Sequence, residues 1–344
     1  MNITFIVPCK DLSGGLRVVA AHGNGLLQRA HRVTIVYPKR RLKRRRAFKR
    51  WARRKLLRER DHLDFFKGTL LAVPGIEEEY IPDGDCLVAT AWETAQWVKD
   101  FPDRCGRKFY LIQGYEIWAG KKEAVDATFH YPFKKAVVSS WLKKLIEQKS
   151  GEKDIPVIPN GRDFSPPDSC ERLARKYDIG MVYSPVIEKQ CMVGLKALHD
   201  VMESFPGLKI ALFGSEKPGI PMPRAARFFL RPSREKIRRL YLDTRIWISS
   251  SRSEGFCLPA LEAISLGSVV VATNSLGIED IIDDGENGLL VEPGNPLALA
   301  DKIRMVLEDT SLEARLRVKG IEKSKIFSWK AATDQLEKLL SGGS

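Results

Sequence analysis

Short apolar runs alternate with helical segments along most of the chain, and this alternation limits the folds that the sequence can adopt. The first runs are "NITFIVP" (2–8) and "RVTIVYP" (32–38), separated by a glycine turn and a segment with rough helical spacing. "DCLVAT" (85–90) and "KFYLIQ" (108–113) continue the series. Short continuous apolar strands between helices are typical of buried parallel sheets. The pattern therefore predicts an α/β fold.

A second series of the same kind begins near Tyr177, and two series predict two doubly wound domains. Its strands are expected at 177–184, 208–214, 244–250 and 269–273. We also expect a strand within 154–161, a helix over 278–285, and a helix that begins with Ser233 as its N-cap.

Pro, Gly and Ser cluster around 160–169 and indicate a domain boundary. We predict an N-terminal Rossmann-like domain over 1–163 and a C-terminal Rossmann-like domain over 164–325. The remaining residues, 326–344, are expected to form a C-terminal helix that packs back on the N-terminal domain, and a flexible tail.

Positive charge is concentrated in one segment, 39–60, which has 14 Lys or Arg and one acid, whereas the remainder has 43 basic and 42 acidic residues. If this segment is helical, five apolar side chains of it and its continuation fall within one sector about 140° wide, namely Phe48, Trp51, Ala52, Leu56 and Leu63. A basic amphipathic helix with aromatic residues indicates binding to an anionic membrane surface. An anionic polysaccharide partner and a merely solvated helix are the alternatives. We expect no nucleic-acid partner, because no recognised motif accompanies the charge.

The six cysteines are scattered without a C-x-x-C motif or a Cys/His cluster. This spacing favours buried thiols in a reducing compartment over a zinc site. The apolar run Ile3–Val7 is too short for a signal peptide, and no stretch approaches the ~20 apolar residues of a membrane span. We therefore expect a cytoplasmic protein, peripheral at the inner face of the cytoplasmic membrane.

The stretch "SRSEGFCLPALEAISLGSVVVAT" (251–273) follows a predicted strand and places Pro259 at the start of a helix. A helix start offers unpaired N–H groups and partial positive charge, which suit a diphosphate. Gly255 lets the backbone approach a ligand closely. Glu262 is expected in the first helical turn, where its carboxylate can accept hydrogen bonds from both hydroxyls of a ribose. Alternatively, Glu262 only complements the helix dipole.

The same stretch, followed by "GIEDIIDDGENGLLVEPG" (277–294), resembles the C-terminal signature of family 4 (group 1) glycosyltransferases of GT-B architecture. "IPNGRDF" (158–164) is similar to the interdomain motif of that family, and "DLSGGLRVV" (11–19) to its N-terminal glycine loop. The resemblance implies two Rossmann-like domains facing across a cleft, with the acceptor side in 1–163 and the nucleotide-sugar-binding site in 164–325. It also implies sugar transfer from a nucleotide-diphosphate donor with retention of configuration.

By this resemblance, Glu254 faces the transferred sugar and Glu262 holds the donor ribose. Lys189 neutralises the diphosphate, which is the leaving group. Gln113 stands where the family often has a histidine near the reacting sugar. The remaining donor contacts implied are main-chain groups at Gly14, Gly15, Gly255, Phe256, Cys257 and Leu258.

The chain departs from the family pattern at Ser184, where an arginine is expected at the end of a strand. Ser184 is thus expected in the donor site without the usual charge, and Arg231, Arg234 or Arg252 are alternatives for the missing cation. Cys257 stands where glycine is common, which narrows the pocket slightly. Further acceptor-side candidates, each with a structural alternative, are Tyr115, Glu116 and residues 90–94.

No D-x-D follows a strand, so we expect no essential metal and no cofactor beyond the donor, a UDP-, GDP- or dTDP-sugar. The expected acceptor is a lipid-linked or anionic cell-surface glycan, such as lipopolysaccharide core. One alternative is a nucleotide-sugar epimerase, which would need further acid/base groups, but no histidine lies in the matched signature. Another is a non-catalytic glycan- or membrane-binding protein. The Glu254/Glu262 pair argues against it, and Ser184 is the feature in its favour.

Overall fold

The computed structural model describes residues 1–10, 12–39, 61–166 and 175–342. The chain divides into two compact units, which we call unit 1 (Met1–Gly161 with Trp329–Ser344) and unit 2 (Arg162–Ser328). The sequence placed the boundaries at 163 and 325. The predicted basic helix over 39–60 lies, apart from Lys39, outside the described residues.

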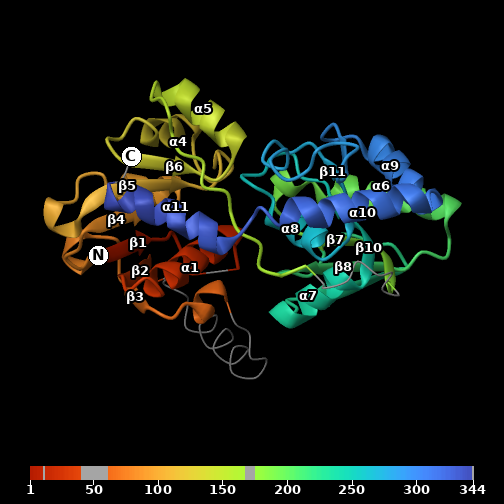
Figure 1. Cartoon of the computed structure of the whole chain (residues 1–344), viewed down its shortest axis with the longest axis horizontal. Coiled ribbons are helices and arrows are strands. Elements are labelled where there is room, and N and C mark those ends of the chain that lie inside the picture. The colour runs from red at the N-terminus through yellow and green to blue at the C-terminus, as the bar shows by residue number, and fades with distance from the viewer. Residues whose placement is uncertain (11, 40–60, 167–174, 343–344) are drawn as a thin grey trace. The chain divides into compact units, whose positions relative to one another are not determined.

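Unit 1 is built on a six-stranded sheet in which all neighbouring strands are parallel (Figure 1). Its strands are β1 (Asn2–Ile6), β2 (Arg32–Pro38), β3 (Thr69–Val73), β4 (Cys86–Ala89), β5 (Arg107–Ile112) and β6 (Lys134–Val137). Its helices are α1 (Gly14–Leu27), α3 (Trp92–Val98), α4 (Lys122–Thr128), α5 (Ser140–Ser150) and α11 (Trp329–Ser341). The strand order β3-β2-β1-β4-β5-β6 reverses between β1 and β4. Ligands of doubly wound sheets bind at the carboxyl ends of the strands at such a reversal.

Unit 2 repeats this plan with a second six-stranded parallel sheet. Its strands are β7 (Tyr177–Tyr183), β8 (Ile210–Gly214), β9 (Ala226–Leu230), β10 (Thr244–Ser249), β11 (Val269–Thr273) and β12 (Leu289–Val291). Its helices are α6 (Cys191–Ser204), α7 (Arg234–Leu242), α8 (Leu258–Ser265), α9 (Pro296–Glu308) and α10 (Thr310–Ser324). The order β12-β11-β10-β7-β8-β9 reverses between β7 and β10. The α/β fold with two Rossmann-like units is confirmed.

Close packing joins β7 and β10, the two strands at this reversal. Trp247 on β10 is fully buried, and a Cβ atom added to Gly180 on β7 would lie 2.2 Å from its ring. Only glycine therefore leaves room for the indole at this position. The ring of Tyr241 also packs against Trp247, with the two ring centroids 4.3 Å apart. This packing fixes the positions of β7 and β10 relative to each other. The loops that follow the two strands therefore begin from well-packed residues.

The sequence prediction missed two strands and misassigned two segments. β3 and β9 each lie at one edge of their sheet, and most of their residues are only half-buried, so neither is a buried core run. Within 154–161 the structure has a single bridge, between Val157 and Val137, and no strand. Turns replace the helix expected over 278–285. The N-cap at Ser233 is confirmed, because its hydroxyl accepts a hydrogen bond from the N–H of Lys236 at 3.2 Å. None of the helices in the described parts is long and apolar enough to cross a membrane.

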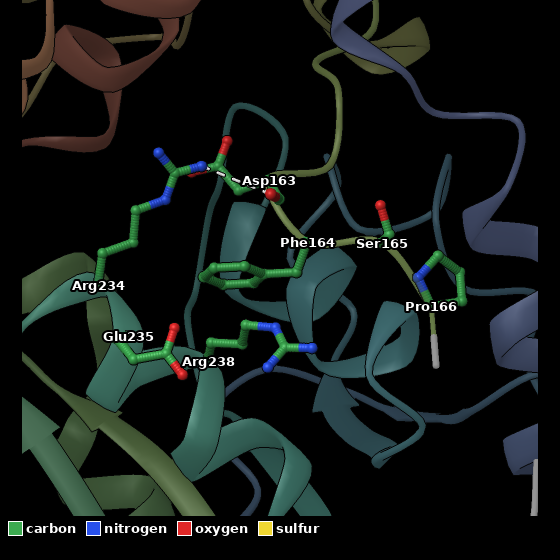
Figure 2. Close-up of a pocket in the computed structure, with 7 residues that line it drawn as sticks. All are labelled: Asp163, Phe164, Ser165, Pro166, Arg234, Glu235 and Arg238. Carbon is green, nitrogen blue, oxygen red and sulfur yellow. Dashed lines mark hydrogen bonds and ion pairs between the residues drawn. The ribbon is translucent and has the colours of Figure 1, made fainter. Parts of the chain in front are cut away.

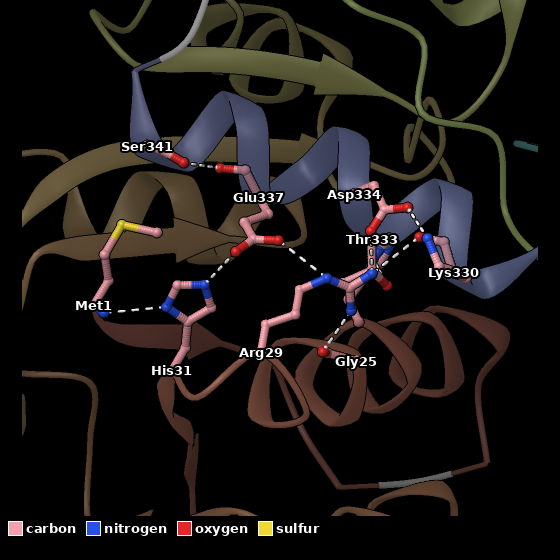
Figure 3. Close-up of polar contacts among 10 residues, drawn as sticks. Met1, Gly25, Arg29, His31, Lys330, Thr333, Asp334, Glu337 and Ser341 are labelled. Atoms are coloured by element: carbon pink, nitrogen blue, oxygen red, sulfur yellow. Dashed lines mark hydrogen bonds and ion pairs between the residues drawn. The ribbon is translucent and has the colours of Figure 1, made fainter.

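Helix α11 packs on α1 within unit 1, and polar contacts hold the two helices together (Figure 3). Arg29, just beyond α1, pairs with Asp334 and, at 3.0 Å, with Glu337. The ring of His22 lies edge-on to Trp329, with centroids 5.6 Å apart. Burial lowers the pKa of His22 to about 4, and the positive charge of Arg29 acts in the same direction. His22 is thus neutral in the folded protein at neutral pH.

This buried histidine predicts a loss of stability in mild acid. The pKa of His22 is lower in the folded state than in the unfolded state, so the unfolded chain binds one more proton between about pH 6.5 and pH 4. The free energy of unfolding should fall by up to about 1.4 kcal/mol per pH unit in this window and level off below pH 4. Denaturant unfolding at several pH values measures the slope.

The variant His22→Gln removes the titrating group and should flatten this slope. The matched change His199→Gln, at an exposed histidine of α6, is the control and should leave the slope as in the wild type. An unchanged slope in His22→Gln would show that another group causes the acid sensitivity.

Candidate active site

Two loops meet at the carboxyl ends of β7 and β10, and both carry predicted site residues. The loop after β7 contains Lys189, and the loop after β10 contains Glu254. The hydroxyl of Ser250 donates to the carbonyl oxygens of Lys189 (3.2 Å) and Gln190 (3.1 Å). The N–H of Arg252 donates to the carbonyl oxygen of Glu188 at 2.6 Å. The reversal point of unit 2 is therefore a structured site.

An ion pair between Lys189 and Glu254 lies at the centre of this site. The Lys189 Nζ atom is 2.6 Å and 2.7 Å from the two carboxylate oxygens, and the hydroxyl of Ser251 donates to Oε1 at 2.6 Å. The carboxylate is 11% exposed and the lysine side chain 38%. Burial opposes the charged form of Lys189, but Glu254 outweighs it and holds the pKa of the lysine above its usual value. The pair is thus ionised at neutral pH.

The start of α8 presents main-chain donors beside this pair. The N–H groups of Phe256, Cys257 and Leu258 donate no hydrogen bond to any described residue. Cys257 has a left-handed backbone (φ 68°), which explains a preference for glycine here. Its thiol is buried, 3.6 Å from the Ser249 hydroxyl. Burial raises the pKa of this thiol to about 12, so Cys257 supplies a main-chain donor and no nucleophile.

Glu262 lies in the second turn of α8 and not in the first turn as expected, because the helix begins one residue earlier than predicted. The helix begins at Leu258, one residue before Pro259, and its first turn has no acid. The dipole effect falls off within the first turn, so complementing the helix dipole is a weak reason for this acid. The side chain is only 2% exposed. Burying a carboxylate costs free energy unless hydrogen-bonding or charged partners offset it.

Ser184, where the resemblance expects arginine, stabilises its own turn. Its N–H donates to the Cys191 sulfur at 3.2 Å, and its hydroxyl accepts from the N–H of Val186 at 3.3 Å. It provides no charge to the site.

The backbone of Glu254 is fixed by a hydrogen bond from its N–H to the carbonyl oxygen of Ser275 at 2.9 Å.

In unit 1, the predicted residues Gly14, Gly15 and Gln113 also lie at a reversal point. Helix α1 begins at Gly14. A Cβ atom on Gly15 would lie 3.4 Å from the amide oxygen and nitrogen of Gln113, and Gln113 Nε2 donates to the carbonyl oxygen of Thr90 at 3.3 Å. The buried Oε1 atom of Gln113 accepts no hydrogen bond from the described residues. This amide oxygen is therefore available to a hydroxyl group.

The other acceptor-side candidates have structural partners. The hydroxyl of Tyr115 donates to Asp126 at 2.9 Å. The Glu116 carboxylate accepts from the N–H of Trp92 at 2.9 Å, at the start of α3. Burial raises the pKa of Glu116 to about 7, despite that hydrogen bond. Thr94 caps the same helix through hydrogen bonds to the backbone of Thr90 and Ala91.

A cavity of 570 Å³ lies elsewhere in unit 2, at the start of α7 (Figure 2). Its lining residues are Asp163, Phe164, Ser165, Pro166, Arg234, Glu235 and Arg238. Arg234 pairs with Asp163 at 3.3 Å, and its guanidinium carbon is 5.7 Å from the centre of the Phe164 ring. None of the predicted donor-site residues lines this cavity, so volume alone does not identify the site.

Sequence reasoning missed three residues that shape the loop. Ser250 and Ser251 follow β10 directly and tie the loop to Lys189 and Glu254. A Cβ atom on Gly277 would lie 2.5 Å from the carbonyl oxygen of Gly255, so a glycine is needed there. The run of hydroxyl residues directly after a buried strand was a usable signal, whereas the role of Gly277 required the structure.

Comparison with known proteins places the matched part of the chain in unit 2. Residues 176–323 match the model of the family described as glycosyl transferases group 1. An uncharacterized glycosyltransferase of Methanocaldococcus jannaschii is 36% identical over 99 residues, which are 29% of this chain and 28% of that protein. The O-antigen chain mannosyltransferase B of Escherichia coli is 34% identical over 101 residues, 29% of this chain and 26% of that protein. The chain therefore matches less than a third of the length of either relative.

A solved structure extends the similarity of fold to the whole chain. The Anabaena protein HepE in complex with UDP-glucose superimposes with a TM-score of 0.78, covering 99% of this chain and 100% of that one. The two sequences are 16% identical, and the likeness shows a shared GT-B fold.

The Lys189–Glu254 pair predicts a stability change on removal of the cation. Lys189→Met leaves a largely buried carboxylate without its partner and should lower the free energy of unfolding by about 1–3 kcal/mol, between the values for exposed and buried pairs. Adding Glu254→Gln should recover part of this loss. Denaturant unfolding of the two single variants and the double variant measures the coupling.

The exposed pair Lys319–Glu322, 3.2 Å apart, provides the matched control. Lys319→Met should cost less than about 1 kcal/mol. Equal losses from Lys189→Met and Lys319→Met would contradict a structural role for the pair at the site.

Proposed function

We propose that the protein is a retaining glycosyltransferase, because residues 176–323 match the family model described as glycosyl transferases group 1. It moves a hexosyl or deoxyhexosyl group from a nucleotide-diphosphate donor to a cell-surface glycan. The observation that carries the proposal is the start of α8, where unpaired N–H groups lie beside Lys189, Glu254 and Glu262. This arrangement suits a sugar diphosphate, with positive potential for the phosphates and carboxylates for the hydroxyls.

Each group has a distinct task in the proposed reaction. Glu262 accepts hydrogen bonds from the donor ribose, and Glu254 from the hydroxyls of the transferred sugar. Lys189 and the N–H groups of Phe256, Cys257 and Leu258 stabilise the negative charge that develops on the leaving diphosphate. The leaving diphosphate helps to deprotonate the acceptor hydroxyl, and no metal is essential because the main-chain donors and cations supply the positive potential.

Unit 1 provides the acceptor side in this proposal. Gln113 Oε1 accepts a hydrogen bond from a sugar hydroxyl, and Gly14 and Gly15 let a ligand approach the backbone at the start of α1. The acceptor is a lipid-linked or anionic envelope glycan at the inner face of the cytoplasmic membrane. Two observations support this class: the 14 basic residues of segment 39–60, and the similarity to an O-antigen chain mannosyltransferase.

Nucleotide-sugar binding should stabilise the folded protein. In a thermal-shift screen against UDP-, GDP-, dTDP- and ADP-sugars, one base should raise the melting temperature. At a concentration of 100 times the dissociation constant the stabilisation is about 2.7 kcal/mol. Glu262→Gln, which removes a charged acceptor of the ribose hydroxyls, should weaken this ligand about tenfold or more.

Glu313→Gln is the matched control, because Glu313 is also a buried acid of unit 2 and pairs with Arg245 at 2.8 Å. It should leave the affinity for the nucleotide sugar unchanged. Equal affinity of the wild type and Glu262→Gln for the nucleotide sugar would contradict the ribose-binding role of Glu262. A melting temperature that no sugar nucleotide raises would contradict the proposed function.

Membrane binding through segment 39–60 is tested by flotation with vesicles. The protein should float with phosphatidylglycerol-containing vesicles at low salt, because each cation near an anionic surface contributes about 1 kcal/mol. It should stay unbound with phosphatidylcholine alone or in about 0.5 M salt. Replacing Arg44, Arg45 and Arg46 with Gln should reduce the bound fraction. Absence of binding to anionic vesicles would contradict the membrane-surface assignment.

A further inference from the structure

The charge of the donor site is incomplete for a diphosphate ligand. Lys189 is already paired with both oxygens of Glu254, at 2.6 Å and 2.7 Å. Glu262 adds a second acid in α8. A nucleotide diphosphate brings at least two negative charges, which the paired Lys189 alone does not balance, so a further cation within reach would stabilise the bound ligand.

Two other arginines of unit 2, Arg231 after β9 and Arg234 at the start of α7, already bind other residues of the chain. Arg231 Nε donates to the carbonyl oxygen of Ser215 at 2.7 Å. Arg234 pairs with Asp163 and lies over the ring of Phe164, as Figure 2 shows. Moving either guanidinium to a phosphate would break contacts it already makes.

Arg252 differs from both. It lies two residues before Glu254, and its N–H donates to the carbonyl oxygen of Glu188, next to Lys189. Its backbone is thus fixed between the two partners of the central ion pair. Its side chain is exposed, and its guanidinium makes no hydrogen bond or ion pair with any described residue. The group is positioned and available.

We infer that Arg252 is the second cation of the donor site and binds the β-phosphate of the nucleotide diphosphate. This inference rests on the proposed function. A guanidinium forms two parallel hydrogen bonds to a phosphate and stays charged at all working pH values. Arg252 thereby supplies from the loop after β10 the charge that Ser184, at the end of β7, does not carry. Lys189 remains beside Glu254 and contacts the same diphosphate as a point charge.

The test compares diphosphate with monophosphate binding by titration calorimetry. Wild-type protein is titrated with UDP, GDP, dTDP and ADP, and the tightest of these is then compared with its own monophosphate. Arg252→Ala should weaken the diphosphate about tenfold or more, the usual effect of losing a charged hydrogen-bonding partner. The monophosphate, which lacks the β-phosphate, should change less than about threefold. Arg252→Lys should recover part of the loss because it keeps the charge without the paired hydrogen bonds.

Arg224→Ala is the matched control, because Arg224 is another exposed arginine of unit 2 without a hydrogen bond or ion pair to the described residues. It should leave both affinities as in the wild type. Unchanged diphosphate affinity in Arg252→Ala overturns the inference and leaves the proposed function in place. An equal loss for diphosphate and monophosphate also overturns it, because the loop and not a β-phosphate contact would then be responsible. If wild-type protein binds none of the four diphosphates, the proposed function fails and the inference with it.

Discussion

The ion pair between Lys189 and Glu254 joins the loops after two neighbouring strands, and the geometry of the candidate site in unit 2 depends on it. Trp247 packed against Gly180 holds the strands, and hydroxyls of Ser250 and Ser251 fix the loops that follow. The start of α8 then presents its N–H groups from a rigid frame. A site that must stabilise charge as it develops gains from such fixed donors, because they need no reorganisation during the reaction.

Unit 1 has the same architecture with different residues at its reversal point. Its reversal point lies between β1 and β4, and Gly15 and Gln113 are in contact there. The residues predicted for this site, Gly14, Gly15 and Gln113, carry no charge. A neutral amide beside a helix start suits a sugar hydroxyl better than a phosphate, in keeping with an acceptor role. Helix α11 completes unit 1 through Arg29 and the buried His22.

Much of the fold was predictable from sequence, because buried parallel strands are continuous apolar runs. The Glu254–Glu262 stretch is distinctive, and it pointed to the candidate site at the reversal point of unit 2. The edge strands β3 and β9 escaped prediction, since half-buried strands lack that signal. Long-range contacts escaped as well. The closeness of Gly277 to Gly255, and of Arg252 to Glu188, depends on loops that tertiary structure brings together. The exact start of α8 also escaped prediction, and a shift of one residue moved Glu262 from the first helical turn to the second, where the helix dipole acts weakly.

A crystal structure of the protein with a bound nucleotide diphosphate tests the central claim most directly. The account predicts the phosphates within hydrogen-bond distance of Lys189 Nζ and of the N–H groups of Phe256, Cys257 and Leu258, with the ribose hydroxyls on Glu262. A nucleotide bound away from these groups, for example in the cavity lined by Arg234 and Arg238, would contradict it.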